Sequence, residues 1–335
     1  MSGPATIDDV AREAGVSTAT VSRAMRDHPY VAESTRTRVK EAAARLRYVA
    51  NPNAARLASG ATSTVALLAP VLTSWYTGEV VAGVEEVLAE AGYDLLIATA
   101  DPQTRDRMLA GEARFRQRVD GVLLVDVMVR EAGADSLASL DVPVVVLGEE
   151  LHTVTSVSVD NVAGAAMATR HLVDLGHRRI ALIGGRSDAA DARDVPNDRA
   201  SGFRDLLAAA GVALPTEYVT DGGFTIDGGL GSMRALLTLR QPPTAVFAMS
   251  DEMAFGVLQA LRESGLVAGH DVSVVGFDDH TVAESIGLTT VRQPVRSIGR
   301  LGAQILLEHL EGMGAVAHHP MPLTLQVRAS TGRPS

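Results

Sequence analysis

The chain contains no cysteine in its 335 residues. This absence excludes disulfide bonds and thiolate metal sites, and it fits a reducing cytosol. No apolar run approaches the ~18 residues that a membrane span needs, and the N-terminus lacks the apolar core of a signal peptide. We therefore expect a cytoplasmic protein without a membrane segment.

The sequence also lacks the usual signatures of catalysis. No nucleophile stands with a matched base, and the glycine pairs at 184–185 and 222–223 do not have the spacing of a phosphate-binding loop. The run Asp278-Asp279-His280 has neither a second spaced histidine nor the all-oxygen cage of a calcium loop. We expect no enzyme activity, no cofactor and no metal site.

Negative charge predominates, with a formal net charge of −10, but it is unevenly distributed. Residues 1–60 hold nine basic and six acidic side chains, a net charge of +3, so the remaining residues carry −13. A basic N-terminal segment is the electrostatic footprint of a nucleic-acid binder, whereas the acidic remainder is repelled by a duplex.

Residues 6–25 predict two short helices separated by a tight turn. Thr6 with the acid Asp9 three places on is the arrangement that caps a helix start. One apolar face follows at helical spacing, formed by Ile7, Val10, Ala11 and Ala14. Gly15 ends this helix, and Ser17 can cap a second helix over 18–25. Such a pair is a helix-turn-helix, whose second helix enters the major groove of DNA.

The exposed face of the second helix offers side chains that can read DNA. Arg23 can reach a guanine edge with two hydrogen bonds. Thr18 can form a hydrogen bond or contact a thymine methyl, and Ser22 suits a phosphate. A third helix is expected, capped near Glu33-Ser34, with a buried stripe of Val39, Ala42, Ala43 and Leu46. The predicted DNA contacts on this head are Thr6, Ser17, Thr18, Ala19, Thr20, Ser22 and Arg23.

A short hinge helix is predicted over residues 50–61, after a head of residues 1–49. Asn51 is a good N-cap, Pro52 suits the first helical position, and Gly60 suits the end. Such a helix is shorter than the ~12–15 residues at which an isolated helix becomes marginal, so it forms only with help. Leu57 can act as an apolar wedge in the minor groove. The predicted hinge contacts to DNA are Asn51, Ala54 and Leu57.

From Thr64 onward short apolar runs alternate with helical stretches, which predicts parallel sheets with helices on both faces. The apolar share of 46% suffices for large cores. The expected strands are 65–69, 94–99, 121–125, 142–147, 179–183, 245–249 and 272–276. The expected helices include 78–91, 162–175, 198–210 and 252–264. The regular alternation of strand-like and helix-like segments is interrupted around 157–161 and 289–294. These interruptions indicate two similar halves with a cleft between them.

Ligands of such sheets lie at the carboxyl ends of strands. Arg199 and Asp278 can each hold two vicinal hydroxyl groups. Glu149 follows a strand, and an acid there disfavours phosphorylated or carboxylated ligands and suits neutral, hydroxyl-rich ones. The predicted effector-binding residues are Trp75, Tyr76, Glu149, Asp160, Arg193, Arg199, Phe224, Asp251 and Asp278.

Several of these residues have a plainer interpretation that stays open at this point. Trp75 and Phe224 can belong to the core instead of the pocket. Asp160 can be only the cap of the helix that follows it. Arg193 lies in an acid- and arginine-rich loop that can be a solvated surface.

The motif Ile7-Asp8-Asp9-Val10-Ala11 … Ala14-Gly15-Val16-Ser17 … Thr20-Val21-Ser22-Arg23, followed by the hinge with Leu57, resembles the lactose-repressor (LacI) family. The resemblance continues to Arg328 and so covers nearly the whole chain. Two hinge positions depart from the family's usual pattern, Pro52 and the placing of Arg56 directly before Leu57.

The resemblance implies an α-helical helix-turn-helix DNA-binding head plus an α/β periplasmic-binding-protein-like effector domain. That domain, residues 62–330, would bind effector, dimerise and comprise two doubly wound parallel-sheet subdomains. The subdomains would be 62–161 plus 294–322, and 162–290 plus 323–330. The implied partners are double-stranded, pseudo-palindromic operator DNA, a small-molecule effector and a second copy of the chain. Positions that bind effector in the family match Tyr76, Asp160, Arg193, Arg199, Phe224 and Asp278.

The sequence thus predicts a DNA-binding transcriptional regulator, a repressor of carbohydrate uptake or degradation genes that a sugar releases. One alternative is a purine- or nucleoside-responsive member of the same family, in which Trp75, Tyr76 and Phe224 stack on a base. A second alternative is a sugar-processing enzyme fused to a DNA-binding head, for which the chain supplies no acid–base pair.

Overall fold

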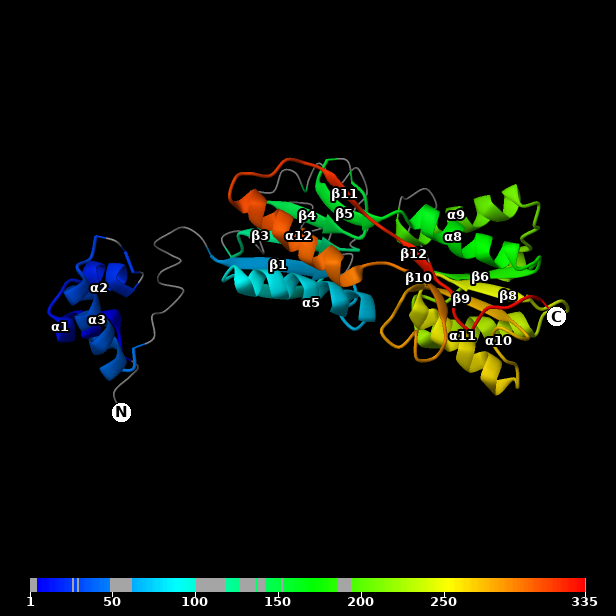
Figure 1. Cartoon of the computed structure of the whole chain (residues 1–335), viewed down its shortest axis with the longest axis horizontal. Coiled ribbons are helices and arrows are strands. Elements are labelled where there is room, and N and C mark those ends of the chain that lie inside the picture. The colour runs from blue at the N-terminus through cyan, green and yellow to red at the C-terminus, as the bar shows by residue number, and fades with distance from the viewer. Residues whose placement is uncertain are drawn as a thin grey trace. The chain divides into compact units, whose positions relative to one another are not determined.

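The structure is a computed structural model that describes residues 5–25, 27–28, 30–48, 62–100, 118–126, 137, 142–151, 153–185 and 194–334. The chain divides into two compact units, a small N-terminal head and a large body that begins at Thr64 (Figure 1). The predicted hinge 50–61, with Asn51, Ala54 and Leu57, lies outside the described residues. Arg193 lies outside them as well.

The head consists of three helices, α1 (Ile7–Ala14), α2 (Thr18–Met25) and α3 (Glu33–Arg45). The predicted cap of α1 is confirmed, because Thr6 Oγ1 accepts from the Asp9 amide while Asp9 Oδ2 accepts from the Thr6 amide. Gly15 then ends the helix with φ +64°, a conformation that glycine adopts without steric cost. The helices enclose a core of small side chains that includes Val10, Ala14, Val21, Ala24, Val39 and Ala42.

The predicted cap of α3 at Glu33-Ser34 is wrong. The N-cap is Ala32, which offers no side-chain hydrogen bond. Glu33 already lies in the first turn, where its carboxylate receives a 2.6 Å ion pair from Arg36 and complements the helix dipole. The buried stripe contains Val39 as expected, and Leu46 packs partly buried against the head core.

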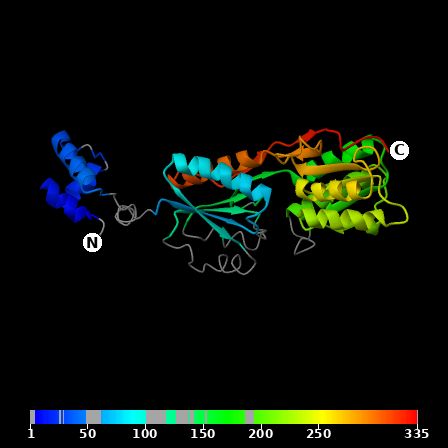
Figure 2. The same ribbon diagram turned by 90° about the horizontal axis from the view of Figure 1, so that it is seen from below.

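The first half of the body, here called the N-lobe, is a six-stranded sheet in the order β11-β5-β4-β3-β1-β2. Its described strand pairs are all parallel. The strands are β1 (Thr64–Ala69), β2 (Asp94–Thr99), β3 (Gly121–Val125), β4 (Val144–Leu147), β5 (Thr155–Val159) and β11 (His318–Met321). Helices α5 (Trp75–Glu90) and α12 (Val295–Leu310) lie side by side on one face of this sheet (Figure 2).

Helices α5 and α12 come from distant parts of the sequence and pack in backbone contact. A β-carbon at Gly83 would collide with the carbonyl oxygen of Arg296, and one at Gly299 would collide with that of Val80. Glycine at both positions therefore sets how closely the two helices approach.

The second half, here called the C-lobe, is a six-stranded sheet in the order β12-β10-β9-β8-β6-β7. Its strands are β6 (Ile180–Gly184), β7 (Val219–Asp221), β8 (Ala245–Ala248), β9 (Ser273–Asp278), β10 (Thr289–Arg292) and β12 (Thr324–Gln326). β12 runs antiparallel to β10, whereas the other described pairs are parallel. Helices α8 (Asn161–Asp174) and α9 (Val195–Ala209) cover one face, and α10 (Ile226–Leu237) and α11 (Asp251–Glu263) cover the other (Figure 1).

The chain crosses between the lobes three times among the described strands and helices. It passes from β5 to α8 at Asp160, from β10 to α12 at Gln293-Pro294, and from β11 to β12 at 322–323. The predicted architecture, a body of two α/β lobes that are each built on a mainly parallel sheet, is confirmed. None of the described helices is long and apolar enough to span a membrane.

Candidate nucleic-acid interface and ligand cleft

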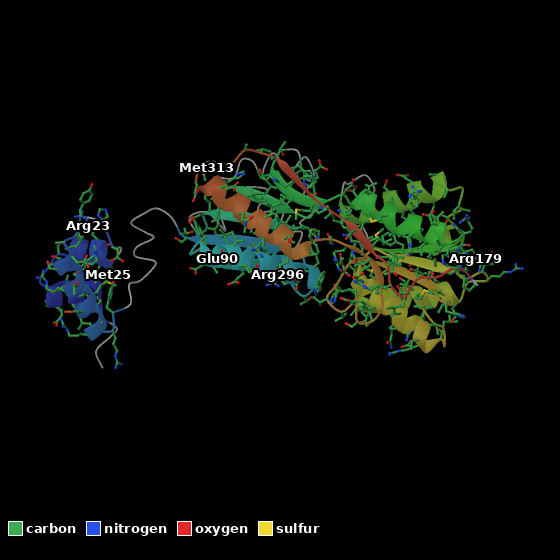
Figure 3. All side chains as sticks on the ribbon, in the orientation of Figure 1. Arg23, Met25, Glu90, Arg179, Arg296 and Met313 are labelled. Carbon is green, nitrogen blue, oxygen red and sulfur yellow. The ribbon has the colours of Figure 1, made fainter. Side chains whose placement is uncertain are left out.

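The exposed face of α2 presents the side chains that the sequence singled out for DNA. Thr18, Ala19 and Arg23 are exposed, while Thr20 and Ser22 are half-buried. The side chain of Arg23, marked on the head in Figure 3, forms no hydrogen bond or ion pair with any described residue. Other basic side chains of the head are engaged with acids: Arg12, Arg36, Lys40 and Arg45. A cation without an internal partner, on an exposed helix face, is free to reach a base edge or a phosphate.

Two of the predicted DNA contacts also have a structural role. Ser17 Oγ accepts from the Thr20 amide at 3.2 Å and lies 2.9 Å from Thr20 Oγ1, so it caps α2. Thr6 caps α1 in the same way. These hydroxyls fix the starts of the two helices and thereby set the angle at which α2 is presented.

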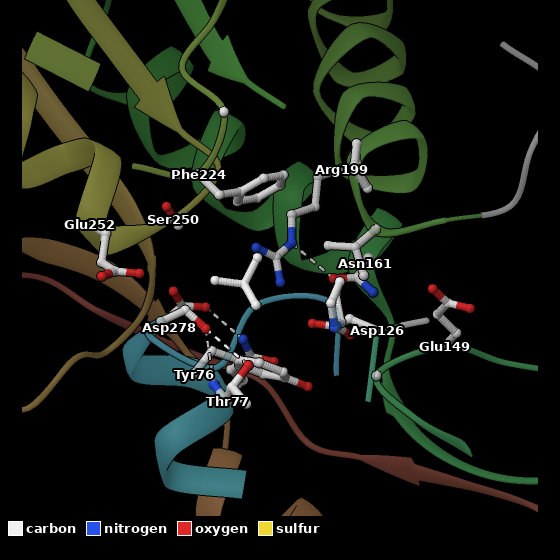
Figure 4. Close-up of a pocket in the computed structure, with 18 of the residues that line it drawn as sticks. Tyr76, Thr77, Asp126, Glu149, Asn161, Arg199, Phe224, Ser250, Glu252 and Asp278 are labelled. Atoms are coloured by element: carbon white, nitrogen blue, oxygen red, sulfur yellow. Dashed lines mark hydrogen bonds between the residues drawn. The ribbon is translucent and has the colours of Figure 1, made fainter. Parts of the chain in front are cut away.

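Residues of both lobes line a cavity of about 270 Å³ in the body (Figure 4). Its walls follow the carboxyl ends of strands: β1, β3 and β4 of the N-lobe, and β7, β8, β9 and β10 of the C-lobe. The polar lining residues are Ser74, Tyr76, Thr77, Asp126, Glu149, Asn161, Arg199, Thr225, Ser250, Glu252, Asp278 and Gln293. We call this cavity the cleft.

Arg199 is buried in the cleft and is held on three sides. Its Nε donates a 2.9 Å hydrogen bond to Asn161 Oδ1, and Nη1 donates to the Met249 carbonyl oxygen. Its Cζ lies 3.6 Å from the centre of the Phe277 ring. Burial lowers the pKa of Arg199, and the nearby carboxylates of Asp278 and Asp126 oppose that shift. The guanidinium is thus a fixed element of the cleft.

Asp278 lies across the cleft from α9, at the end of β9, and is buried. Its backbone has φ +130°, which aims the side chain away from the regular strand direction. Gln293 Nε2 donates a 2.6 Å hydrogen bond to Asp278 Oδ1. Burial raises the pKa of Asp278 to about 8, although the Arg199 charge opposes this shift.

Asp126 enters the cleft after β3, with φ +48°. Its Oδ1 is buried and has no hydrogen-bond partner in the part of the chain that the structure describes. Burial raises the pKa of Asp126 to about 6. Gly148 makes room for this carboxylate, since a β-carbon at 148 would collide with Asp126 Oδ1.

Five of the predicted effector-binding residues line the cleft: Tyr76, Glu149, Arg199, Phe224 and Asp278. The rings of Tyr76 and Phe224 come from opposite lobes (Figure 4). The structure does not bring Asp160 into this lining. Its carboxylate caps α8 by accepting from the Ala163 amide at 2.8 Å.

Trp75 and Asp251 are two further predicted residues that do not line the cleft. The Trp75 ring, on α5 of the N-lobe, contacts His280 of the C-lobe in a tilted arrangement, with centroids 4.7 Å apart and an interplanar angle of 34°. Asp251 is fully buried, and its carboxylate accepts from Thr290 Oγ1 at 2.6 Å and from the His280 amide at 2.7 Å. Asp251 therefore holds the loop after β9, while Trp75 joins the lobes.

Several cleft residues were missed by sequence reasoning. Asp126 follows β3, so the same rule that selected Glu149 after β4 would have found it. Asn161 and Gln293 lie where the chain crosses between the lobes. The interrupted alternation of strands and helices indicated these two segments but not the individual residues. Glu252 follows Asp251 at the start of α11, and no pattern in the sequence distinguishes which of these two acids enters the cleft.

Comparisons with known proteins match both units. Residues 6–51 match the family described as bacterial regulatory proteins, lacI family, and residues 169–331 match the periplasmic binding protein-like domain. The chain is 37% identical to the HTH-type transcriptional regulator CelR of Thermobifida fusca, over 92% of each chain. It is 32% identical to the HTH-type transcriptional repressor PurR of Photobacterium profundum, again over 92% of each.

Solved structures resemble the chain along almost its whole length. A lac repressor dimer bound to operator and the anti-inducer ONPF has a TM-score of 0.85 and 27% identity, covering 98% of this chain and 100% of that one. A complex of the transcriptional regulator CelR with cellobiose has a TM-score of 0.70 and 34% identity, covering 97% and 99%.

Proposed function

The chain belongs to the lacI family of bacterial regulatory proteins and is a transcription regulator, and from this premise we propose that it represses genes of carbohydrate uptake or degradation. It acts in the cytoplasm as a homodimer on a pseudo-palindromic operator. A hydroxyl-rich small molecule that enters the cleft lowers its affinity for that operator.

The DNA-binding part of the proposal rests on α2. One face of this helix carries Thr18, Ser22 and Arg23, and the Arg23 side chain has no partner among the described residues. Arginine hydrogen-bonds a guanine edge with two donors, and hydroxyl side chains reach phosphates or thymine methyls. Operator recognition is assigned to this face, and Thr6 and Ser17 add contacts near the helix starts. Residues Asn51, Ala54 and Leu57 are proposed to contact the operator from the hinge.

The observation that carries the ligand part is the composition of the cleft. Fixed hydrogen-bonding groups of both lobes, Arg199 and Asp278 among them, face one cavity whose walls also hold the rings of Tyr76 and Phe224. Aromatic faces with surrounding donors and acceptors suit a sugar ring. The related CelR was solved as a complex with cellobiose, which agrees with such a ligand.

The switch is proposed to be a shift between two arrangements of the lobes. A ligand that contacts both lobes stabilises the arrangement in which they close around it. Three crossings connect the lobes, so closure changes the position of the N-lobe and of the segment leading to the head. A 100-fold loss of operator affinity requires ~2.7 kcal/mol of differential binding, which is within the usual range of allosteric coupling.

A second candidate is a purine- or nucleoside-responsive regulator that acts with a corepressor. Tyr76 and Phe224 can stack on a base, and the chain is also similar to PurR repressors. Glu149, buried in the cleft, favours ligands rich in hydrogen-bond donors and disfavours phosphorylated ones. This chemistry favours a carbohydrate.

The experiment measures DNA affinity against a ligand panel. Binding sites are first selected from random duplexes with the full chain, and affinity for the selected site is then measured with sugars, nucleobases and nucleosides. Trp75 is the only tryptophan and bridges the lobes, so its fluorescence reports ligand entry directly. Release by sugars supports the proposal. Tighter DNA binding with nucleobases, and no effect of sugars, contradicts it.

A further inference from the structure

Acidic side chains predominate in the cleft. Among the described lining residues Asp126, Glu149, Glu252 and Asp278 are acids, and Arg199 is the only base. In Figure 4 the carboxylates of Glu252 and Asp278 lie on one side of the cavity and those of Asp126 and Glu149 on the other. A ligand in the cavity is therefore flanked by carboxylates from both lobes.

A single arginine cannot balance the charge of four acids, although Arg199 lies close enough to lower the pKa values of Asp126 and Asp278. Two of its nitrogens donate to Asn161 and to the Met249 carbonyl, and its face lies on Phe277. These hydrogen bonds use Nε and Nη1 and go to neutral partners of the C-lobe. Burial raises the pKa values of Asp126, Glu252 and Asp278, which means that the protein itself stabilises their ionised forms poorly.

Asp126 is the clearest unmet group. Its Oδ1 is buried, has no hydrogen-bond partner among the described residues, and belongs to a residue that lines the cleft. A buried carboxylate oxygen without a partner is costly, and the cost is removed when a donor, best a charged one, enters beside it. Among the described residues no group of three acids or histidines is arranged to hold a metal ion there.

A second hollow adjoins the cleft and is also lined by acidic side chains. It shares Gly148, Glu149 and Asn161 with the cleft, and its other acids are Glu150, Asp160, Asp194 and Asp198. Its described lining includes one histidine and no lysine or arginine. Neighbouring charges of one sign lower the electrostatic potential in both hollows and raise the local concentration of cations.

We propose that the effector is an amine-bearing carbohydrate, an amino sugar or a short oligomer of one, whose ammonium group lies beside Asp126. This inference rests on the proposed function, because it assigns the ligand class of the same cleft. The hydroxyl groups of the sugar bond to Arg199, Asp278 and Gln293, and its ring lies against Tyr76 or Phe224. The ammonium donates to Asp126 Oδ1 and supplies the charge that the cleft lacks.

The test compares sugars that differ only in one substituent. Full-length protein is titrated calorimetrically at pH 7 in phosphate buffer, which contains no competing amine. The probes are triplets in which one hydroxyl is replaced by an ammonium or by an acetamido group: glucose, galactose and cellobiose with their 2-amino and 2-acetamido counterparts. A charge-assisted hydrogen bond exceeds a neutral one by enough to give about tenfold tighter binding. We expect that preference for the amino member of the best-binding triplet.

Each outcome decides the question. Equal or tighter binding of the neutral or acetamido member, or no binding of any amino member, overturns the amine assignment. If neutral sugars bind and release DNA, the carbohydrate function survives without the amine. If only nucleobases bind, both proposals fail.

A matched pair of variants locates the amine site. Asp126→Asn preserves shape but removes the charge, so the preference for the amino over the neutral member should fall at least about tenfold. Glu90→Gln makes the same charge change at an exposed position of α5 (Figure 3) and should leave the preference unchanged. An unaltered preference in Asp126→Asn overturns the position of the amine. The comparison in the unmodified protein holds whether or not the variant folds.

Discussion

Gln293 Nε2 donates a 2.6 Å hydrogen bond to Asp278 Oδ1, and both side chains are buried. Gln293 belongs to the segment that crosses from β10 to α12, whereas Asp278 ends β9 in the cleft. The bond therefore joins a connection between the lobes to a carboxylate that a ligand would meet. Burial raises the pKa of Asp278 to about 8, although the Arg199 charge and this hydrogen bond oppose the shift.

The raised pKa of Asp278 predicts how the stability of the ligand-free protein depends on pH. Unfolded, this carboxyl titrates near 3.8, and in the fold its pKa is about 8, so the native state binds more protons between these values. The free energy of unfolding should therefore fall as pH rises from about 4 to 8. Asp126 and Asp251, with pKa values raised to about 6, act in the same direction over the lower part of this window.

Asp278→Asn should flatten this pH dependence, because the amide does not titrate. Urea denaturation at pH 6 and pH 8 measures the difference. Glu284→Gln, an exposed change in the same lobe, serves as the control and should keep the slope of the unmodified protein. A variant slope as steep as the control's would place the responsible protons elsewhere.

Arg199→Lys is expected to destabilise the C-lobe and to abolish the response to effector. A lysine ammonium cannot reach Asn161 Oδ1 and the Met249 carbonyl together and cannot cover the Phe277 ring as a plane does. One buried acceptor left without a donor costs about 1–3 kcal/mol. The exposed Arg204 on the same helix provides Arg204→Lys, which should change stability by less than about 0.5 kcal/mol. Equal urea midpoints for the two variants would contradict the structural role of Arg199.

Gly83→Ala and Gly78→Ala should have opposite effects although both lie on α5. The added methyl at 83 meets the carbonyl oxygen of Arg296 on α12, and overpacking of this kind costs about 1–3 kcal/mol. At 78 the methyl meets open space, and alanine is the better helix former by up to about 1 kcal/mol. Thermal melts of the two proteins check the signs. A stabilising Gly83→Ala would show that α5 and α12 are not in backbone contact.

Arg23→Ala should reduce discrimination between the selected operator and unrelated DNA by about 1–3 kcal/mol. The reason is that Arg23 is exposed on α2 and has no partner among the described residues. Arg38→Ala removes the same charge from an exposed position on α3 and should weaken binding to the operator and to unrelated DNA to a similar extent. Affinity is measured by fluorescence anisotropy at several salt concentrations. An unchanged ratio in Arg23→Ala would remove the base-reading assignment.

The arrangement of strands and helices in the body could largely be predicted from its apolar runs. β2 and β3 have the predicted bounds, and β1, β6 and β8 differ by one residue at one or both ends. Runs such as Leu67-Leu68 are buried on both faces of a parallel sheet, so their pattern is unbroken and easily recognised. β5 was not among the expected strands because it reads Thr155-Ser156-Val157-Ser158-Val159. Its serines are nevertheless buried, and Ser156 Oγ lies 3.1 Å from His318 Nδ1 of the neighbouring strand.

Which side chain enters the cleft was harder to predict. Asp251 and Glu252 are adjacent acids after β8, yet tertiary contacts turn the first toward Thr290 and leave the second in the lining. Asp126 and Asp278 are aimed by positive φ angles that depend on the folded context. The head was more predictable, because the cap of α1 depends only on Thr6 and Asp9, three residues apart. Capping side chains did not predict the start of α3, because its N-cap is Ala32, which has no side-chain hydrogen bond to offer.

Two of the three connections between the lobes run directly past the cleft, beside Asn161 and Gln293. In the proposed switch these connections are the pivots of the lobes, so the pivots and the groups that select the ligand are the same few residues. A substitution that changes ligand specificity at these residues then also changes the equilibrium between the open and closed arrangements of the ligand-free protein. Divergence within such a protein should proceed by paired substitutions, one restoring the balance that the other disturbed.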